Sequence, residues 1–190
     1  MKTAHTLTRL CQQKGYITED QMPWLQYTIE KRLSTLLIWI PLFLNGIYLV
    51  SPIVSFSFIS SFLYLRKRTN GFHAKTLLGC FWGSIISETF FLGILFKRMQ
   101  LWMAVLFLVT SSVIIFFFAP FNHPLMCFSS EEIKACAKSS RKRLFVLIVV
   151  VIIGYILNYK ELSHSIILGI TMTATMLVSA KITLRSQKNE

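Results

Sequence analysis

The sequence predicts an all-α, polytopic membrane protein with about six transmembrane or membrane-embedded helices, preceded by a cytosolic or interfacial helical segment. The first observation is composition, because 54% of the 190 residues are hydrophobic and the mean hydropathy is +0.57. The second is a series of apolar runs, and the third is the position of the cations beside them. We expect a single integral membrane domain over residues 1–190, with membrane helices in 33–180 and a cytosolic tail in 181–190.

The segment before the first apolar run, residues 1–32, lacks the apolar stretch of a signal peptide. Leu7 and Cys11 have the spacing of one helix face. Thr18 with Gln21 forms a weak capping-box pattern, which predicts the start of a second helix. We therefore expect this segment to be helical and to lie in the cytosol or on the membrane surface.

Six apolar runs follow. They occupy residues 33–48, 51–65, 76–96, 101–119, 144–159 and 163–180. Only the third and fourth approach the roughly 20 residues that a perpendicular span needs. The first, second and fifth are short, and Pro41, Asn45 and Pro52 indicate that the first pair is irregular. Four spans with re-entrant elements therefore stay open as an alternative to six.

The cations favour six spans with both termini in the cytosol. On that path seventeen of the twenty Lys and Arg residues lie inside, and only Lys97, Arg98 and Lys160 lie outside. The inner loops would attract anionic lipids, by about 1 kcal/mol per cation near the surface. Although the net charge is +12, no nucleic-acid-binding signature accompanies it, so nucleic acid is not an expected partner.

The first inner loop contains the stretch RTNGFHAKTLLGC, in which His73 precedes Cys80 by seven residues. A helix capped by Thr76 would place Cys80 in or just after its first turn. Backbone N–H groups there and the nearby cation of Lys75 favour a thiolate. A neutral His73 imidazole could accept the thiol proton, although a lone cysteine in an apolar helix is more often an inert packing residue.

Geometry limits this pairing. Seven residues on a continuous helix are separated by about 10.5 Å at about 1.5 Å per residue, which is too far for proton transfer. The pairing of His73 with Cys80 therefore requires the chain around Gly71 to leave the helix and fold back. Such irregular backbone at membrane depth must be buried in protein or line a wet cavity.

Glu88 lies eight positions beyond Cys80, about 12 Å along a straight helix. Carboxyl groups inside a membrane are rare and are usually paired or functional, so a structural role and a site-lining role both stay open. The main alternative to an enzyme is a non-catalytic membrane transporter or accessory subunit. In that protein Glu88 would line a substrate path and the basic inner loops would bind lipid.

The second inner loop follows residue 119. Ser129 or Ser130, followed by two glutamates, predicts the start of a short helix. His123 and Cys127 are four residues apart, but a proline intervenes and no second ligand pair exists, so we expect neither a metal nor another cofactor.

These residues resemble the accessory gene regulator protein B (AgrB) family of enzymes that process quorum-sensing peptides. The resemblance is carried by Arg66, Gly71, His73, Ala74, Lys75, Thr76 and Cys80, and by residues 119–124. Chain length, apolar runs and basic loops agree along nearly the whole chain. The sequence departs at Asn70-Gly71-Phe72, where many members have a second glycine or a tyrosine, and at Asn122, where an acidic residue is common. The departures concern substrate specificity.

The resemblance implies a thiol protease of the cell membrane, with Cys80 as nucleophile, His73 as base and the active site near the cytoplasmic face. The substrate would be a short propeptide with an amphipathic leader and an acidic C-terminal tail. Cleavage through an acyl-enzyme thioester would lead to a thiolactone or lactone autoinducing peptide. Among the candidate substrate-binding residues, Arg66, Gly71 and Lys75 belong to the family motif. Arg141, Lys142 and Arg143 are proposed on electrostatic grounds as partners of an acidic tail, and Glu88 is a further candidate. Homo-oligomerisation is compatible with such an enzyme, although nothing in the sequence demands it.

Overall fold

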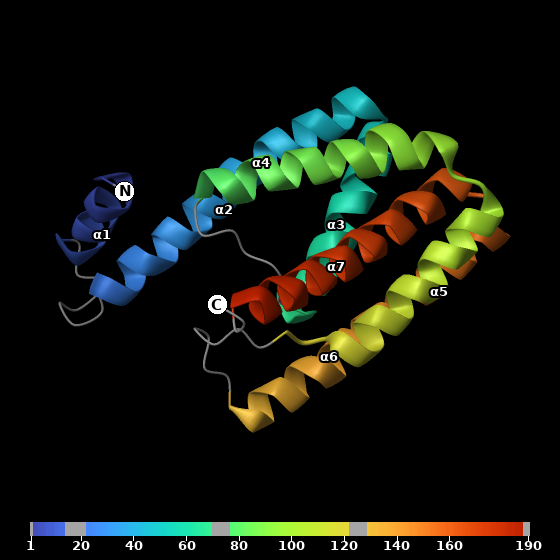
Figure 1. Cartoon of the computed structure of the whole chain (residues 1–190). Helices are drawn as coiled ribbons and strands as arrows, with labels where there is room; N and C mark the ends of the chain where they lie inside the picture. Colours follow the sequence, from blue (N-terminus) through green and yellow to red (C-terminus); the bar gives the residue numbers. More distant parts are fainter. Residues whose placement is uncertain (1, 14–21, 70–76, 122–128, 188–190) are drawn as a thin grey trace. The chain divides into compact units, whose positions relative to one another are not determined.

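The computed structural model describes residues 2–13, 22–69, 77–121 and 129–187. Helices joined by short connections make up this part of the chain (Figure 1). The described residues contain no strand, which confirms the predicted all-α fold. The chain divides into two compact units, Met1–Leu42 and Phe43–Glu190. The single domain expected from the sequence stays a prediction.

The first unit contains α1 (Lys2–Gln13) and the larger part of α2 (Met22–Leu49). α2 has Pro23 in its first turn, where a missing N–H leaves no helical bond unmade. The predicted first apolar run is continuous with this helix, because no Gly or Pro interrupts residues 24–40. Pro41 lies inside α2, and the boundary between the units follows Leu42. The helix start expected at Thr18 and Gln21 lies outside the described residues.

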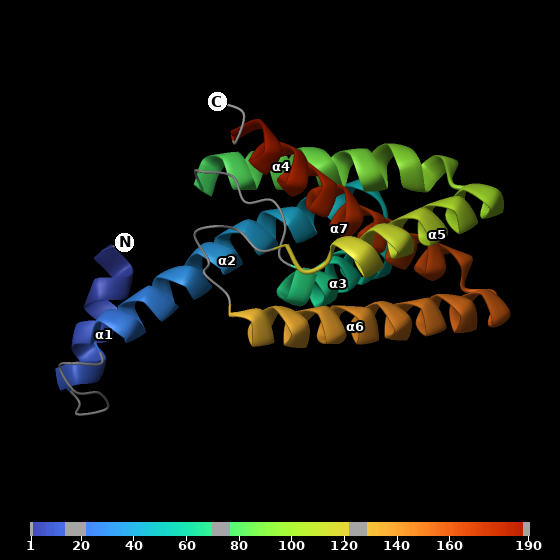
Figure 2. The same ribbon diagram turned by 60° about the horizontal axis from the view of Figure 1, so that its bottom comes forward.

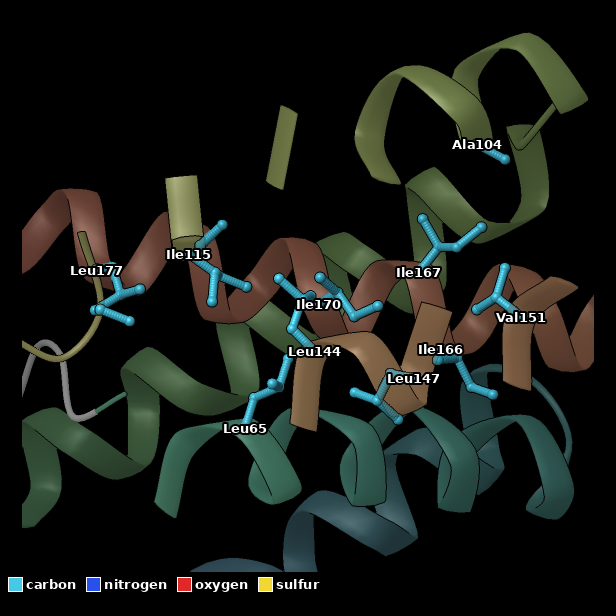
Figure 3. Close-up of a cluster of buried hydrophobic side chains, with 12 residues drawn as sticks. Leu65, Ala104, Ile115, Leu144, Leu147, Val151, Ile166, Ile167, Ile170 and Leu177 are labelled. Carbon is cyan, nitrogen blue, oxygen red and sulfur yellow. The ribbon is translucent and has the colours of Figure 1, made fainter. Parts of the chain in front are cut away.

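Four helices form the core of the second unit. They are α3 (Pro52–Thr69), α5 (Leu101–Phe118), α6 (Ser130–Ile156) and α7 (Lys160–Gln187). α7 packs against the other three, and α3 also packs against α6 (Figure 2). The core cluster draws on all four helices, with Leu65, Ile115, Leu147 and Ile170 among its buried side chains (Figure 3). A hydrogen bond of 3.1 Å from Ser111 Oγ to Thr171 Oγ1 joins α5 to α7 inside this core.

Small residues allow α3 and α7 to approach closely. Gly169 of α7 lies against α3, where an added Cβ would meet Ser61 Oγ at 2.1 Å and the Phe58 carbonyl oxygen at 2.8 Å. Small residues at helix contacts are typical of membrane proteins, in which packing rather than the hydrophobic effect joins the helices. Gly169 therefore sets how closely these two helices pack.

The second inner loop and the fifth apolar run form one helix, α6. Ser129 caps it through a full capping box: the Ser129 side chain accepts from Glu132 N at 3.2 Å, and the Ser129 N–H donates to the Glu132 carboxylate at 2.9 Å. The predicted start is therefore confirmed. The expectation of a short helix is wrong, because no Gly or Pro separates this start from the apolar run that follows.

The remaining helical path begins with α4 (Leu77–Glu88). It continues as the π-helix η2 (Thr89–Leu95) and the 3-10 helix η3 (Phe96–Arg98), and the backbone is still helical at Glu88 and at Phe96. The helical path therefore covers nearly all of the third apolar run, residues 76–96. π-helices are rare and often occur at functional positions.

Among the described residues, two helical segments are long and apolar enough to cross a membrane: Leu101–Phe118 and Lys160–Thr183. The first is only 17% buried within the protein and the second 61%. The exposed side of α5 presents large apolar groups such as Trp102 and Phe117. A surface of this kind is compatible with contact with lipid rather than water. The six-span topology stays a prediction.

Candidate functional site

The predicted nucleophile, Cys80, lies in the first turn of α4, which begins at Leu77. Its side chain falls outside the described part of the chain, as do the whole of Gly71, His73 and Lys75. The distance between the His73 and Cys80 side chains is therefore not described, and the catalytic pair stays a prediction.

Five cations at one end of the second unit are called the basic end below: Arg66, Arg141, Lys142, Arg143 and Lys181. Two of these cations bind across helices to carbonyl oxygens. Arg141 Nε donates to the Phe116 carbonyl oxygen at 3.4 Å. Arg143 Nη1 donates to the Tyr64 carbonyl oxygen. α6 is thereby tied to both α5 and α3.

The partner of Arg141 has a local chemical cause. The Phe116 carbonyl lies in the last turn of α5, where the next donor along the helix would be the N–H of residue 120. Residue 120 is a proline and has no N–H. Arg141 supplies a donor in its place.

Three cations of the basic end also lie over aromatic rings. The guanidinium carbon of Arg141 is 4.3 Å from the centroid of the Phe116 ring, and that of Arg143 is 4.7 Å from the Tyr64 ring. Lys181 Nζ of α7 is 3.9 Å from the Phe118 ring. These distances are within the range of cation–π attraction, so these side chains brace the bundle as well as charging its surface.

Lys142 differs from its two neighbours. It is exposed, and within the described part of the chain it has no hydrogen bond, ion pair or ring contact. Arg66, in the last turn of α3, is partly buried. Within the described block Arg141–Arg143, Lys142 is therefore the cation that has no such contact and projects into solvent.

A backbone hydrogen bond lies beside the two inner loops of the sequence analysis. The Phe121 N–H donates to the carbonyl oxygen of buried Thr69 at 2.9 Å, which joins the ends of α3 and α5. The segment with His73 follows Thr69, and the segment with His123 follows Phe121. Sequence reasoning missed this backbone link, because it joins residues 52 positions apart.

A second polar cluster surrounds Glu88, which is only 1% exposed. Asn45 Nδ2 donates to Glu88 Oε2 at 3.0 Å and to Thr89 Oγ1 at 3.2 Å. The other carboxylate oxygen of Glu88, Oε1, and the hydroxyl group of buried Ser55 have no hydrogen-bond partner among the described residues. The sequence identified Glu88 as unusual, but Asn45 stood out only as a polar residue in an apolar run, and nothing local connected the two.

No group of three or more His, Cys, Asp or Glu side chains within the described ranges is arranged to hold a metal ion. His123 and Cys127, which are four residues apart in the sequence, lie outside those ranges. The functional groups that the structure describes are therefore a cationic surface, a buried carboxyl group and a cysteine near the start of a helix.

The described part of the chain defines a helical protein whose outer surface is compatible with membrane association and which carries a cluster of cations at its basic end. The family model described as Accessory gene regulator B matches residues 4–177, and the chain belongs to this family. The family consists of peptidases that process propeptides in quorum sensing. No curated protein and no solved structure matches the chain significantly.

Proposed function

We propose that this protein is a membrane-embedded cysteine endopeptidase that removes the acidic C-terminal tail of a short autoinducer propeptide and promotes its cyclisation. The observation that best supports this is the start of α4 at Leu77, three residues before Cys80. Backbone N–H groups near a helix start favour a thiolate over a thiol, and so favour a nucleophile there. Membership of a propeptide-processing family supports the same reaction.

In the first chemical step, His73 takes the proton of the Cys80 thiol, and the sulfur attacks the carbonyl carbon before the tail. The C–N bond breaks as the imidazolium returns the proton to the leaving amine. The products are a thioester on Cys80 and a free tail with a new amino terminus. Because a thioester is less stable than an amide, the intermediate must be kept from water.

In the second step, an internal thiol or hydroxyl group of the peptide attacks the thioester carbonyl. The bond to Cys80 breaks, the attacking group loses its proton to His73, and the thiol of Cys80 is restored. Exchange with a thiol is nearly balanced in energy, so the enzyme's contribution is to hold the two ends together and exclude water. A site at the membrane boundary suits both tasks.

The basic end provides the complement of an acidic tail. We assign the direct contact to Lys142, because its charge faces solvent, and to Arg66 through its match to the family motif. Arg141 and Arg143 add positive potential while they brace the bundle. Gly71 and Lys75 stay candidate contacts through their place beside His73. The same cations would hold anionic lipid headgroups around the site.

The protein would act at the cell membrane as a multi-pass protein, with both termini and the active site on the cytoplasmic side. The distribution of cations supports this orientation. The exposed apolar faces of α5 and α6, with Phe117 and Phe145 among them, would contact the acyl chains.

The test is intact-mass spectrometry of the protein co-expressed with candidate propeptides. We expect a covalent adduct on Cys80 with the mass of the peptide lacking its tail. The adduct should be absent from Cys80→Ala, and His73→Ala should slow its formation by roughly 10²-fold or more through loss of the base. Cys136→Ser, which changes a free cysteine of α6, is the matched control and should behave as the wild type.

Cleavage that persists in Cys80→Ala would overturn the proposal. So would a well-inserted wild-type protein that neither forms an adduct nor cleaves any candidate. That second result would favour the non-catalytic transporter, and Glu88→Gln would be the variant to examine next.

A further inference from the structure

Glu88 is a buried residue with no role in the proposed reaction. It is the only buried residue among those of α4 whose side chains are described. Elsewhere on the same helix, Leu78, Trp82 and Ile86 are 68%, 57% and 65% exposed. The described contacts of α4 with the rest of the second unit are therefore concentrated at its C-terminal end.

One side chain forms hydrogen bonds to that end of α4. The Asn45 amide crosses from α2 and donates both of its hydrogens, one to Glu88 at the last position of α4 and one to Thr89 at the first position of η2. Both bonds fall at the junction where the helix changes from α to π. The bond to Glu88 is partly buried and the bond to Thr89 lies at an exposed residue, so one amide joins α2 to the junction through two hydrogen bonds.

The neighbouring residues show that this contact is close-packed. An added Cβ on Gly46 would lie 2.1 Å from Ser55 Oγ and 3.1 Å from Glu88 Oε1. Only a residue without a side chain therefore fits where α2 approaches both α3 and α4. The carboxyl group is enclosed by three helices, and its 1% exposure gives a peptide no direct access to it.

Cys80 lies at the other end of the same α-helix, eight residues earlier and about 12 Å away along the axis. Glu88 cannot touch atoms reacting at Cys80 across that distance. An α-helix of this length is nearly rigid, so its depth and rotation at one end set the position of the other.

We propose that Asn45, Glu88 and Thr89 form a polar clamp that fixes the depth and rotation of α4 and thereby positions Cys80. Glu88 is then a positioning residue rather than a substrate contact or a proton carrier. The assignment of Cys80 as the positioned group rests on the proposed function.

The first measurement compares Glu88→Gln with Glu88→Leu in propeptide cleavage by the full-length protein in lipid nanodiscs. Gln keeps an acceptor for Asn45, so kcat should stay within about threefold of wild type. Leu removes the acceptor, and kcat should fall by roughly tenfold or more while KM changes less than about threefold. Glu161→Gln and Glu161→Leu, at an exposed glutamate of α7, are the matched controls and should match wild type.

The second measurement is a double-mutant cycle between positions 45 and 88. Asn45→Leu should reproduce the loss seen in Glu88→Leu, and the double variant should lose little more than either one. Thr89→Val keeps the side-chain volume and removes only one of the two bonds. It should cause a smaller loss in the same direction, which keeps the test decisive if a leucine variant fails to insert.

A third measurement is independent of the peptide. In a protein that keeps Cys80 as its only cysteine, the rate of thiol modification by a small maleimide should change in Glu88→Leu and not in Glu88→Gln. If the wild type cleaved no peptide, the proposed function would fail while this rate still reported on the clamp. The clamp is overturned if Glu88→Gln is as damaging as Glu88→Leu while Asn45→Leu is harmless, because the carboxyl group itself would then be required.

Discussion

At the residue scale, three adjacent cations of α6 have different surroundings. Arg141 and Arg143 each combine a carbonyl acceptor with an aromatic ring, whereas Lys142 between them projects into solvent. Successive helical residues point in directions about 100° apart, so neighbours in sequence are exposed to different environments. Electrostatic and structural roles can therefore be separated by changing these residues one at a time.

For Lys142→Glu, we expect KM for an acidic-tailed propeptide to rise about fivefold, which corresponds to roughly 1 kcal/mol for an exposed charge contact. Protein yield and thermal stability should not change, because the side chain is exposed and makes no hydrogen bond, ion pair or ring contact within the described part of the chain. Steady-state cleavage assays at low and high salt provide the measurement, and the effect should shrink at high salt. Lys160→Glu is the control, because Lys160 lies at the start of α7, away from the basic end. An equal effect of both reversals would show that only net charge matters.

Arg143→Lys should lower the stability of the protein, whereas Lys142→Glu should leave it unchanged. The charge remains, but the planar guanidinium that lies over Tyr64 and binds its carbonyl oxygen is lost. We expect a loss of roughly 1 kcal/mol in unfolding free energy, the sum of a weakened ring contact and a weakened hydrogen bond. Thermal unfolding in detergent, followed by tryptophan fluorescence, measures it. An unchanged midpoint would mean that the contact does not brace α3 against α6.

At the element scale, contact between helices depends on small residues at a few positions. Gly169 brings α7 against the backbone of α3, and Gly46 brings α2 against Ser55 and Glu88. Hydrophobic pattern alone does not identify such positions, because a glycine in an apolar run is equally compatible with a lipid-facing surface. Gly83 of α4 has that open character, with nothing within 4 Å of an added Cβ.

Gly169→Ala should destabilise the protein by about 1 to 3 kcal/mol, because the new methyl group overlaps atoms of the α3 backbone that cannot move aside. Gly83→Ala should be neutral or stabilising by up to about 1 kcal/mol through helix propensity. Unfolding midpoints of the two variants under identical conditions test the pair. If the two alanines cost the same, close packing of α3 on α7 is not required for stability.

At the scale of the whole molecule, the proposed function requires a defined orientation in the membrane. The connection between α6 and α7, near Lys160, is expected outside, and the start of α6, near Lys134, inside. Both residues are exposed in the fold, so their replacement by cysteine should not disturb it.

In a cysteine-free background, a membrane-impermeant maleimide added to intact cells should label Lys160→Cys and not Lys134→Cys. Permeabilised cells should show labelling at both positions, which controls for accessibility. Labelling of Lys134→Cys in intact cells would contradict the cytoplasmic placement of the basic end, and with it the proposed side of peptide processing.

The sequence by itself determined the helical class, the positions of the apolar runs and several helix ends. The fourth run, residues 101–119, matches α5 within a residue, and the Ser129 cap forms as its pattern indicates. These features depend on apolar length, on capping side chains and on proline, all of which act within a few residues. The motif around His73 and Cys80 is local as well, and the family resemblance it carried was confirmed by the family match.

Only the tertiary structure decided which distant groups meet. Asn45 and Glu88 are 43 residues apart, and the ends of α3 and α5 are joined by a backbone bond from Phe121 to Thr69. Pairings of this kind follow from how whole helices pack, which depends on glycine contacts and core shape rather than on any short pattern. For the same reason Arg141 and Arg143 appeared in the sequence as charge alone, and it was the packing of α6 against α3 and α5 that gave them partners.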